Sequence, residues 1–340
     1  MDIVSNAFVA KDKSPAKTLR VTETRLCSKQ EWNAFAQSCN ATYLCSYGHV
    51  MSERLQRRVR VFAAYVDDTK IAQCAISFGR FRGRTDGRFI DTIQLLPSYG
   101  SYWEQVMQAV LDVSGPGHYR YGSKWSIEPP RAKQFAILGG ISIECVTAYN
   151  VQVVEFAQWP SWEAYEKAVS LNARRNAAKA LKSDPPATIT INHGRKAVVD
   201  VVPLIRMKFA VRRRKGLKDA NVYVSAVRYI MRTLLMNERS YTGKVTHLGR
   251  VAAYFSDVDF GLDTYYLDGA SLPDNGGAAW LLMLEMLRRA WRANGKVFIS
   301  MYEPGSDWAG KDNILLSRQH LRVTEYPCEV VTYHYARWRT

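Results

Sequence analysis

The sequence predicts an α/β (α+β) protein of about two domains, in which mixed central sheets are flanked by helices. The length of 340 residues corresponds to about two domains, at roughly 100–200 residues each. Predicted helices and strands alternate along the chain, and both halves read in the same order: helices, a strand hairpin, then alternating helices and strands. A hydrophobic content of 47% and a charged content of 23% are typical of globular proteins, which excludes a disordered chain.

In the first half, Ser28 and Glu31 form a capping-box pattern that predicts the start of a helix carrying Trp32. The apolar runs on either side of the turn residues 67–70 are typical of a hairpin. After that first helix, we expect a helix at about 47–58, hairpin strands at 59–66 and 71–78, a strand at 89–96, a helix at 102–113, a strand at 119–127, a short helix at 131–138 and a long strand at 141–156.

In the second half, helical periodicity and β-branched runs give a similar series. We expect a helix at 162–181, a strand at 187–192, helices at 202–215 and 221–238, a hairpin over 246–270 with its turn at 256–259, a helix at 278–294 closed by Gly295, a strand at 297–302, a helix at 311–320 and a strand region at 321–335. The predicted organisation is a polar tail at 1–20, a first domain at 21–157 and a second at 158–340, with the strand region 321–337 able to pack back on the first.

Two short matches suggest that the halves are copies of one unit. Arg60-Val-Phe-Ala-Ala-Tyr65 resembles Arg250-Val-Ala-Ala-Tyr254, and Trp32-x-x-Phe35 resembles Trp162-x-x-Tyr165. We interpret them as a duplicated α/β unit with extra helices at 202–238 in the second copy; chance similarity of short apolar strands is the alternative.

The net charge of +16 is concentrated in two blocks. Residues 54–88 hold nine basic and three acidic side chains, a net of +6, and residues 204–250 hold twelve and two, a net of +10. Concentrated positive charge favours a polyanionic partner, either a nucleic acid or an acidic small substrate. A solvated helix face is the alternative for stretches such as 212–215.

Several classes of protein are not supported by the sequence. No apolar run reaches the roughly 18 residues of a membrane span, and residues 1–20 contain no apolar run typical of a signal peptide, so we expect a soluble cytoplasmic protein. The six cysteines form no C-x-x-C pair, so we expect reduced thiols and no structural zinc. No P-loop, G-x-S-x-G or H-E-x-x-H motif is present, and we predict no metal site. An enzyme of this composition would act by positioning and polarisation.

A glycine-bearing loop at 273–277 leads into the predicted helix at 278–294. Backbone amides at such a helix start can hold an anion or a developing oxyanion, although a plain turn and cap gives the same pattern.

The order of several stretches carries a family resemblance. They are Trp162-Glu-Ala-Tyr165, Asn172-Ala-Arg-Arg175, the run 204–216 ending in Arg-Arg-Arg-Lys-Gly, Tyr265-Tyr-Leu-Asp-Gly-Ala-Ser271, the Trp280 helix ending at Gly295, and Leu316-Ser-Arg318. In this order the chain resembles the FemABX-type peptidyltransferases, relatives of the GNAT acyltransferases, over about 25–335.

The resemblance implies two tandem GNAT-like domains with an acceptor in the cleft between them. Such proteins transfer an aminoacyl group from charged tRNA to an amine, so aminoacyl-tRNA would be a co-substrate and no cofactor is needed. The acceptor would be a peptide, a cell-wall precursor or a natural-product intermediate. A Phe-Lys pair of the family corresponds here to Ser317-Arg318, where the cation is retained and the aromatic ring is absent.

On this basis we assign three sets of candidate residues. The catalytic candidates are Arg318, for charge stabilisation, and the strand-end carboxylates Asp268 and Glu303, for the acceptor amine. The substrate-binding candidates are Trp162, Tyr165, Tyr254, Tyr266 and Ser271. The candidates for tRNA or phosphate binding are Arg174, Arg175, Arg212, Arg213, Arg214 and Lys215.

Two other functions fit the same residues. An acyl-CoA-dependent acyltransferase would carry an [RQ]-x-x-G-x-[GA] loop, but the sequence offers only Asn275-Gly-Gly-Ala278. A non-catalytic RNA-binding module would use the two basic blocks alone.

Overall fold

The computed structural model describes residues 18–79, 86–128, 131–214, 216, 222–306 and 311–336. Lys215, one of the predicted phosphate contacts, lies outside these residues. The first half, residues 18–155, contains β1 (Leu19–Thr24), α1 (Lys29–Ser38), α2 (Tyr47–Arg54), β2 (Arg58–Val66), β3 (Thr69–Phe78), β4 (Asp86–Phe89), β5 (Gln94–Leu95), α3 (Trp103–Ser114), β6 (Gly117–Tyr121), α4 (Ala132–Phe135) and β7 (Ile141–Glu155).

The second half, residues 156–336, has a similar series preceded by two additional helices. It contains α5 (Trp162–Ala168), α6 (Leu171–Leu181), β8 (Thr188–His193), α7 (Val198–Arg214), α8 (Val222–Met236), β9 (Ser240–His247), β10 (Arg250–Phe260), β11 (Asp263–Ser271), α9 (Ala278–Ala290), β12 (Lys296–Tyr302), α10 (Lys311–Gln319) and β13 (Thr324–Tyr335).

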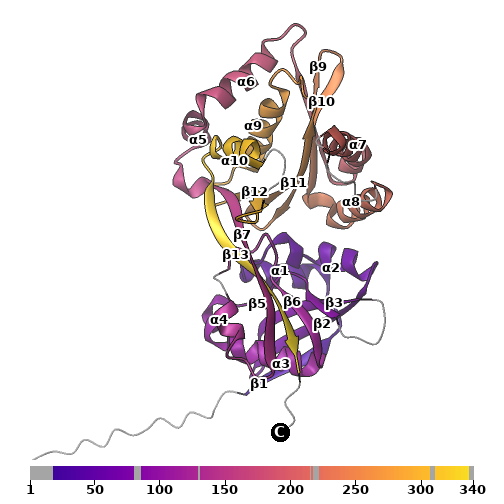
Figure 1. Cartoon of the computed structure of the whole chain (residues 1–340), viewed down its shortest axis with the longest axis vertical. Helices are drawn as coiled ribbons and strands as arrows, with labels where there is room; N and C mark the ends of the chain where they lie inside the picture. The colour runs from indigo at the N-terminus through magenta and orange to yellow at the C-terminus, as the bar shows by residue number, and fades with distance from the viewer. Residues whose placement is uncertain are drawn as a thin grey trace, which may run out of the picture.

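One sheet passes through both halves. Its strand order over the described residues is β1-β2-β3-β4-β6-β13-β7-β12-β11-β10-β9-β8, with β5 paired to β3. Figure 1 shows the two halves stacked along the long axis, with β7 and β13 running from one to the other. The predicted α/β fold with two tandem GNAT-like units flanked by helices is confirmed.

The two halves exchange their last strands. β13 pairs antiparallel with β6 of the first half, while β7 pairs antiparallel with β12 of the second, and the two exchanged strands pair with each other. The order β4-β6-β13-β7-β12-β11 is therefore symmetric about the β13/β7 pair. By this symmetry β4 corresponds to β11, β6 to β12, and α3 to α9.

In each half, one pair of parallel strands separates after a short paired stretch. β4 and β6 are paired at three positions, and β11 and β12 at Thr264 and Tyr265 only. Beyond these positions β4 stays paired with β3 and β6 with β13, and likewise β11 stays paired with β10 and β12 with β7. The two parallel strands of each pair therefore separate, and the sheet opens into a wedge between them. A buried helix supports each wedge: α3 through Trp103 and Met107, and α9 through Leu282 and Leu287.

The structure supports a duplication, but with an alignment different from the one that the short matches suggested. The hairpin β2–β3 precedes β4, as β9–β10 precedes β11, so β2 corresponds to β9 and not to β10. Trp32 lies in α1, whereas Trp162 lies in α5, which has no counterpart in the first half. The matches compared non-equivalent elements, because short buried strands share the same few apolar residues.

The predicted turn at 256–259 is wrong, because these residues lie inside β10. The chain turns instead at Leu248–Gly249 and at Gly261, whose φ of 64° suits a glycine. The cause is a buried ion-pair network: Arg289 bonds Asp257 at 2.9 Å and Asp259 at 3.0 Å. Two aspartates that are typical of a turn are thereby accommodated in a strand.

Other predicted boundaries also change. The helix at 162–181 is two helices, because Ser170 caps α6 by accepting a hydrogen bond from the Ala173 amide. The strand at 89–96 breaks at Asp91, whose φ is 71°. The capping box of Ser28 and Glu31 is confirmed, with both reciprocal hydrogen bonds present.

Candidate active site

A pocket of about 310 Å³ lies beside the part of β11 that continues beyond its pairing with β12, and we name it the β11 pocket. It brings together three residues that the sequence singled out, namely Arg318 of α10 and Tyr266 and Ser271 of β11. Its other lining residues come from α7, β10, β11, α9 and α10: Val211, Phe255, Gly269, Ala270, Ala279, Trp280, Met283, Ile314 and Ser317.

Arg318 and Tyr266 form the polar part of this pocket. The guanidinium carbon lies 5.3 Å from the centroid of the tyrosine ring. The Arg318 Nε atom is buried and has no hydrogen-bond partner among the described residues. Burial raises the pKa of Tyr266, and the Arg318 cation acts in the opposite direction, so the hydroxyl stays protonated near neutral pH. A phenol donor and a guanidinium donor therefore face the same space.

Gly269 makes room for the tyrosine. A Cβ atom at position 269 would overlap the Tyr266 hydroxyl oxygen and would lie 2.6 Å from Cδ1 of Phe255. The Phe255 and Tyr266 rings meet edge to face, with centroids 5.2 Å apart. The glycine at this position thus fixes where the Tyr266 hydroxyl lies.

Asp268 does not line the β11 pocket. Its carboxylate is ion-paired with the Lys208 ammonium of α7, which also donates to the Tyr229 hydroxyl at 3.2 Å. Burial raises the pKa of Asp268 and Lys208 acts in the opposite direction. The prediction of Asp268 as the residue that handles the acceptor amine needs correction, because its carboxylate already holds a cation.

Three aromatic candidates lie outside the β11 pocket. Tyr165 is fully buried and donates its hydroxyl to the Leu321 carbonyl at 3.0 Å, so it is a core residue and not a substrate contact. Tyr254 packs between α7 and β11 against Leu204. Trp162 packs in the same hydrophobic core as Tyr165. It also borders a separate hollow of about 330 Å³ beside α5, α6 and α9.

Glu303 is exposed in the turn after β12, where its backbone carbonyl accepts hydrogen bonds from Ser306. Burial and the Glu303 carboxylate together raise the pKa of Tyr149, and Glu303 is not among the residues that line the β11 pocket with Arg318. The structure therefore does not group the three catalytic candidates into one site.

The arginines predicted to bind phosphate occupy two places. Arg174 borders the hollow beside Trp162 and donates to the Val169 carbonyl at 3.1 Å, while Arg175 is exposed on α6. Arg212, Arg213 and Arg214 form the last turn of α7. Since Val211 lines the β11 pocket, this basic turn borders it.

At the helix start that follows the loop 273–277, a side chain of the loop itself already forms hydrogen bonds with two of the backbone amides. The Asn275 side chain accepts hydrogen bonds from the amides of Gly277, at 3.0 Å, and Ala279, at 3.4 Å. Of the two interpretations of this loop, the structure favours the helix cap.

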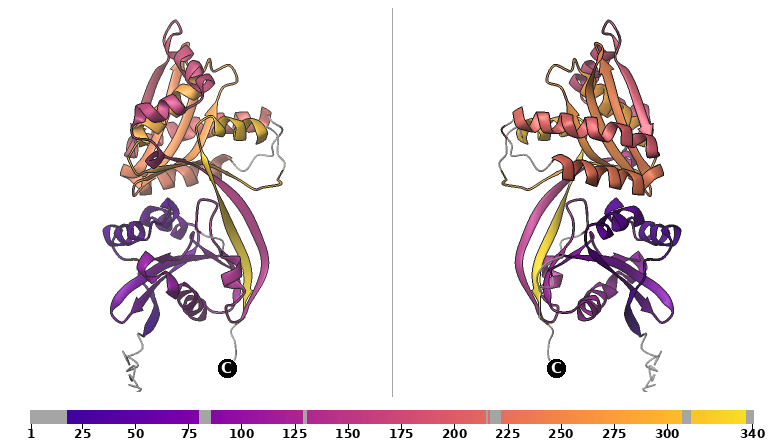
Figure 2. Two further views of the ribbon diagram at one scale, coloured as in Figure 1. Left: turned by 90° about the vertical axis from the view of Figure 1, so that its left-hand side faces the viewer. Right: turned by 90° about the vertical axis from the view of Figure 1, so that its right-hand side faces the viewer.

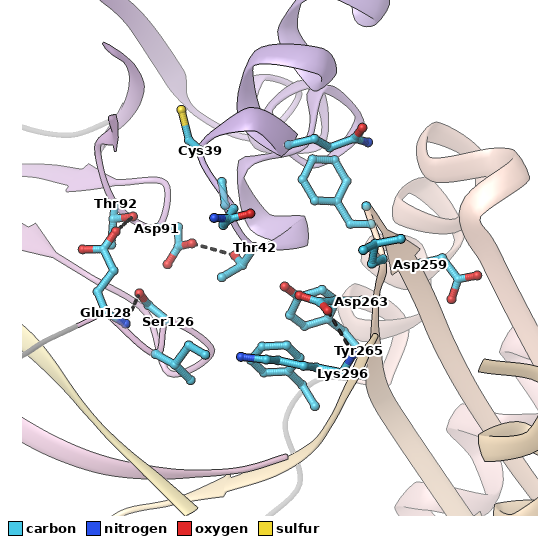
Figure 3. A pocket seen from close by; sticks show the side chains of 18 of the residues that line it. Cys39, Thr42, Asp91, Thr92, Ser126, Glu128, Asp259, Asp263, Tyr265 and Lys296 are labelled. Carbon is cyan, nitrogen blue, oxygen red and sulfur yellow. Dashed lines mark hydrogen bonds between the residues drawn. The ribbon is translucent and has the colours of Figure 1, made fainter. Parts of the chain in front are cut away.

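A larger cavity, of about 1070 Å³, lies between the two halves, and we name it the cleft. The α1–α2 connection, the end of β4 and residues 126–128 line one side, and the turn β10–β11 with the starts of β11 and β12 lines the other. Figure 3 shows Asp91 and Glu128 facing this space from the first half, opposite Tyr265 and Asp263 of the second.

Asp91 and Glu128 form an acidic pair that the sequence analysis did not find. Thr42 donates to Asp91 at 2.6 Å, and Thr92 donates to Glu128 at 2.8 Å. One oxygen of each carboxylate, Oδ1 of Asp91 and Oε2 of Glu128, is buried with no hydrogen-bond partner in the described part of the chain, and Glu128 Oε2 forms an ion pair with Arg131 Nε at 3.7 Å. Burial raises the pKa of Asp91, and it raises the pKa of Glu128 to about 7, with Arg131 acting in the opposite direction.

Asp91 and Asp268 occupy equivalent positions in the two halves. Each lies three residues beyond the last hydrogen-bonded position of its parallel strand pair, which is Arg88 on β4 and Tyr265 on β11. The second-half aspartate is neutralised by Lys208, whereas the first-half aspartate has only the Thr42 hydroxyl and other neutral groups as donors. The strand register, which places these residues at the wedges, is the signal that the sequence alone did not reveal.

Two arginines of the first basic block, Arg57 and Arg88, line another pocket, which we name the arginine pocket. Arg57, Arg88 and Arg120 line a space of about 470 Å³, together with Asp86 and His118. Burial lowers the pKa of Arg88, and so do the nearby cations Arg120, Arg57 and Arg228 of α8. Over the described ranges, none of these four arginines forms an ion pair. The cluster therefore holds more positive than negative charge, with Asp86 in its lining and Glu53 acting on Arg88 in the direction opposite to the arginines.

Solved structures with this fold were found at low sequence identity. The crystal structure of FemX matches with a TM-score of 0.67 at 11% identity, over 91% of this chain and 96% of that one. A conserved protein of unknown function from Bacteroides thetaiotaomicron gives 0.57 at 11% identity, over 94% and 100%. A tandem GNAT protein from the clavulanic acid biosynthesis pathway, solved without AcCoA, gives 0.54 at 11% identity, over 95% and 100%. The resemblance to FemABX-type tandem GNAT proteins is confirmed for the fold.

Protein-family models and curated proteins gave no match to the chain. Over the described residues, every helix is too short or too polar to cross a membrane.

Proposed function

We propose that this protein is an N-acyltransferase that forms an amide bond, with aminoacyl-tRNA as the donor and a peptide or small-molecule amine as the acceptor, acting in the cytoplasm without a cofactor. The observation that carries the proposal is the Arg318 guanidinium, which faces the β11 pocket with its buried Nε unpartnered, beside the protonated Tyr266 hydroxyl. Two preorganised donors in a small wedge suit an acyl carbonyl that becomes negatively charged.

The reaction is direct aminolysis of an ester. The neutral acceptor amine attacks the carbonyl carbon, a C–N bond forms, and the C–O bond to the tRNA ribose breaks. The proton lost by the nitrogen passes to the departing ribose oxygen. Arg318 and Tyr266 stabilise the negative charge that develops on the carbonyl oxygen, and no covalent enzyme intermediate is needed.

The cleft and the arginine pocket supply the remaining binding features. In the cleft, the carboxylates of Asp91 and Glu128 line the side that would receive a cationic group such as an ammonium, with Arg131 already 3.7 Å from Glu128. Ammonium recognition by paired carboxylates is favourable because the cation also relieves their mutual repulsion. The arginine pocket, with no internal counter-ion paired to it, suits phosphate groups of the tRNA or of the acceptor.

An acyl-CoA donor is the second candidate. It is supported by the tandem GNAT protein of similar fold, whose structure is described as lacking AcCoA. The cap formed by Asn275 argues against it here, because the side chain occupies two of the amides at the start of α9.

The donor can be identified by a paired assay. Release of labelled amino acid from total aminoacyl-tRNA is measured with and without cellular amines and with ribonuclease, beside thiol release from acyl-CoA. Label loss that depends on an acceptor and is abolished by ribonuclease supports the tRNA donor. Thiol release supports acyl-CoA, and silence in both assays with retained RNA binding would leave a binding module as the better account.

Arg318→Ala tests the site itself. We expect transfer to fall by about 10²–10³-fold, the usual effect of removing one oxyanion donor. Arg318→Lys keeps the charge but loses the planar fork, so it should recover only part of the rate. The exposed Arg250→Ala is the matched control, and equal rates for the Arg318 and Arg250 variants would remove Arg318 from the site.

A further inference from the structure

The outer face of the helix pair α7–α8 shows a combination of residues that neither the β11 pocket nor the cleft uses. α8 presents four large apolar side chains to solvent: Tyr223, Val224, Val227 and Leu234 are 83%, 56%, 60% and 43% exposed. Their spacing places Tyr223, Val227 and Leu234 on one stripe along the helix. α8 packs on α7 through Ala226, Tyr229 and Ile230, and on α2 of the first half through Leu235.

The charges beside this stripe have one sign. Arg206 and Arg213 are exposed on α7, while the exposed Arg228 of α8 lies on the side of that helix toward Arg88 of the first half. α8 contains no acidic residue, and the one acidic residue of α7, Asp200, is 1% exposed and paired with Lys244. Figure 2 shows α7 and α8 side by side at the surface of the second half, with the sheet behind them. The face is therefore apolar and cationic, with no exposed carboxylate on either helix.

We propose that the α7–α8 face docks on an anionic lipid bilayer, with α8 lying in the plane of the interface. An apolar helix stripe flanked by arginines is the pattern of interfacial helices, which bury apolar side chains among the headgroups and attract acidic lipids. The arginines favour a bilayer over a second copy of this chain, because a symmetric contact would bring like charges together. The apolar stripe favours lipid over RNA, since phosphate recognition does not use exposed valine and leucine side chains. This proposal does not depend on the proposed function.

The test uses the full chain and vesicles of phosphatidylcholine, alone or mixed with phosphatidylglycerol. Cosedimentation should occur with the anionic vesicles and should weaken as salt is raised. The double variant Val227→Glu with Leu234→Glu should lower binding by at least about tenfold, because it removes apolar contacts and adds charges that anionic lipid repels.

The matched control places the same change on another helix. Leu171 and Leu181 of α6 are 50% and 51% exposed, and their replacement by Glu alters the net charge equally. This control should retain vesicle binding. In addition, Arg206→Gln should weaken binding about fivefold without adding negative charge, which separates lipid attraction from simple repulsion.

Three results would overturn the proposal: no binding to anionic vesicles, equal binding to both vesicle types, or an equal loss in the α6 and α8 variants. Oligomeric state is measured in parallel. If the chain is dimeric and the α8 variant becomes monomeric while vesicle binding is unchanged, the face belongs to a second copy and not to a bilayer. Thermal unfolding of every variant checks that the comparison is made between folded proteins.

Discussion

The arginine pocket gives the sharpest separation between a binding role and a structural role. Replacing Arg88 and Arg120 together with Gln removes two of the guanidinium groups that have no ion pair in the described structure. A hydrogen bond to a charged group contributes about 1.5–3 kcal/mol, so each replacement should weaken phosphate binding by about tenfold or more. For RNA, the slope of log affinity against log salt should fall by roughly 1.5, at about 0.7–0.9 per lost contact.

The same double variant, although it binds phosphate more weakly, should be as stable as the unchanged protein or more stable. The pKa of Arg88 is lowered by burial and by Arg120, Arg57 and Arg228, so its charge is repelled in the folded state. Arg88 remains exposed to solvent, and removing a charge that its neighbours repel should leave the melting temperature equal or raise it. A structural arginine would instead lower it on removal.

The assay is filter binding of tRNA and of a nucleoside diphosphate across a salt series. The control replaces two exposed arginines elsewhere, Arg195 and Arg250, with Gln. Unchanged affinity and slope for both probes would refute the assignment of this pocket to phosphate. A lower melting temperature with unchanged binding would show that the cluster is structural.

Three further predictions concern the β11 pocket, the cleft and the buried network. Gly269→Ala should displace the Tyr266 hydroxyl and lower transfer by about a hundredfold, measured as kcat, with the protein still folded. Because burial raises the pKa of Glu128 from 4.5 to about 7, the free energy of unfolding should fall as pH rises through that interval, and Glu128→Gln should flatten this fall in urea titrations at several pH values. Arg289→Met should lower the free energy of unfolding by about 3–5 kcal/mol, because it leaves the buried carboxylate of Asp257 without its cation, while Asp259 keeps Arg292 at 2.8 Å; the exposed Arg288→Met should change it little.

Local signals predicted much of the fold. The capping box at Ser28 and the hairpin over 59–78 depend on residues within a few positions of one another, and both are present. The turn placed at 256–259 failed because Arg289, about thirty residues later, neutralises Asp257 inside a strand. The strand region 321–337 was expected to be able to pack on the first domain, and β13 pairs there with β6; the matching transfer of β7 to the second half, where it pairs with β12, was not expected.

The residues of the candidate site likewise fall into those that the sequence analysis found and those that it missed. Arg318, Tyr266 and Ser271 meet in one pocket, and they came from the family resemblance, which encodes tertiary position. Tyr165 came from the same resemblance, but its hydroxyl is used by the Leu321 carbonyl in the core. Asp91 and Glu128 were missed, because their proximity follows from strand order and from a loop after β6, which no spacing in the sequence indicates.

The exchanged strand β13 also sets the spacing between the pockets, and this spacing bears on the ligand. β13 begins six residues after Arg318, and Thr332 near its other end lines the arginine pocket. The eight residue steps from Thr324 to Thr332 span roughly 26 Å at about 3.3 Å per residue. A single phosphate or a free amino acid cannot reach across that length. A ligand that engages both the arginines and Arg318 must therefore be extended, which favours a tRNA end or a long precursor that passes through the cleft over a small metabolite.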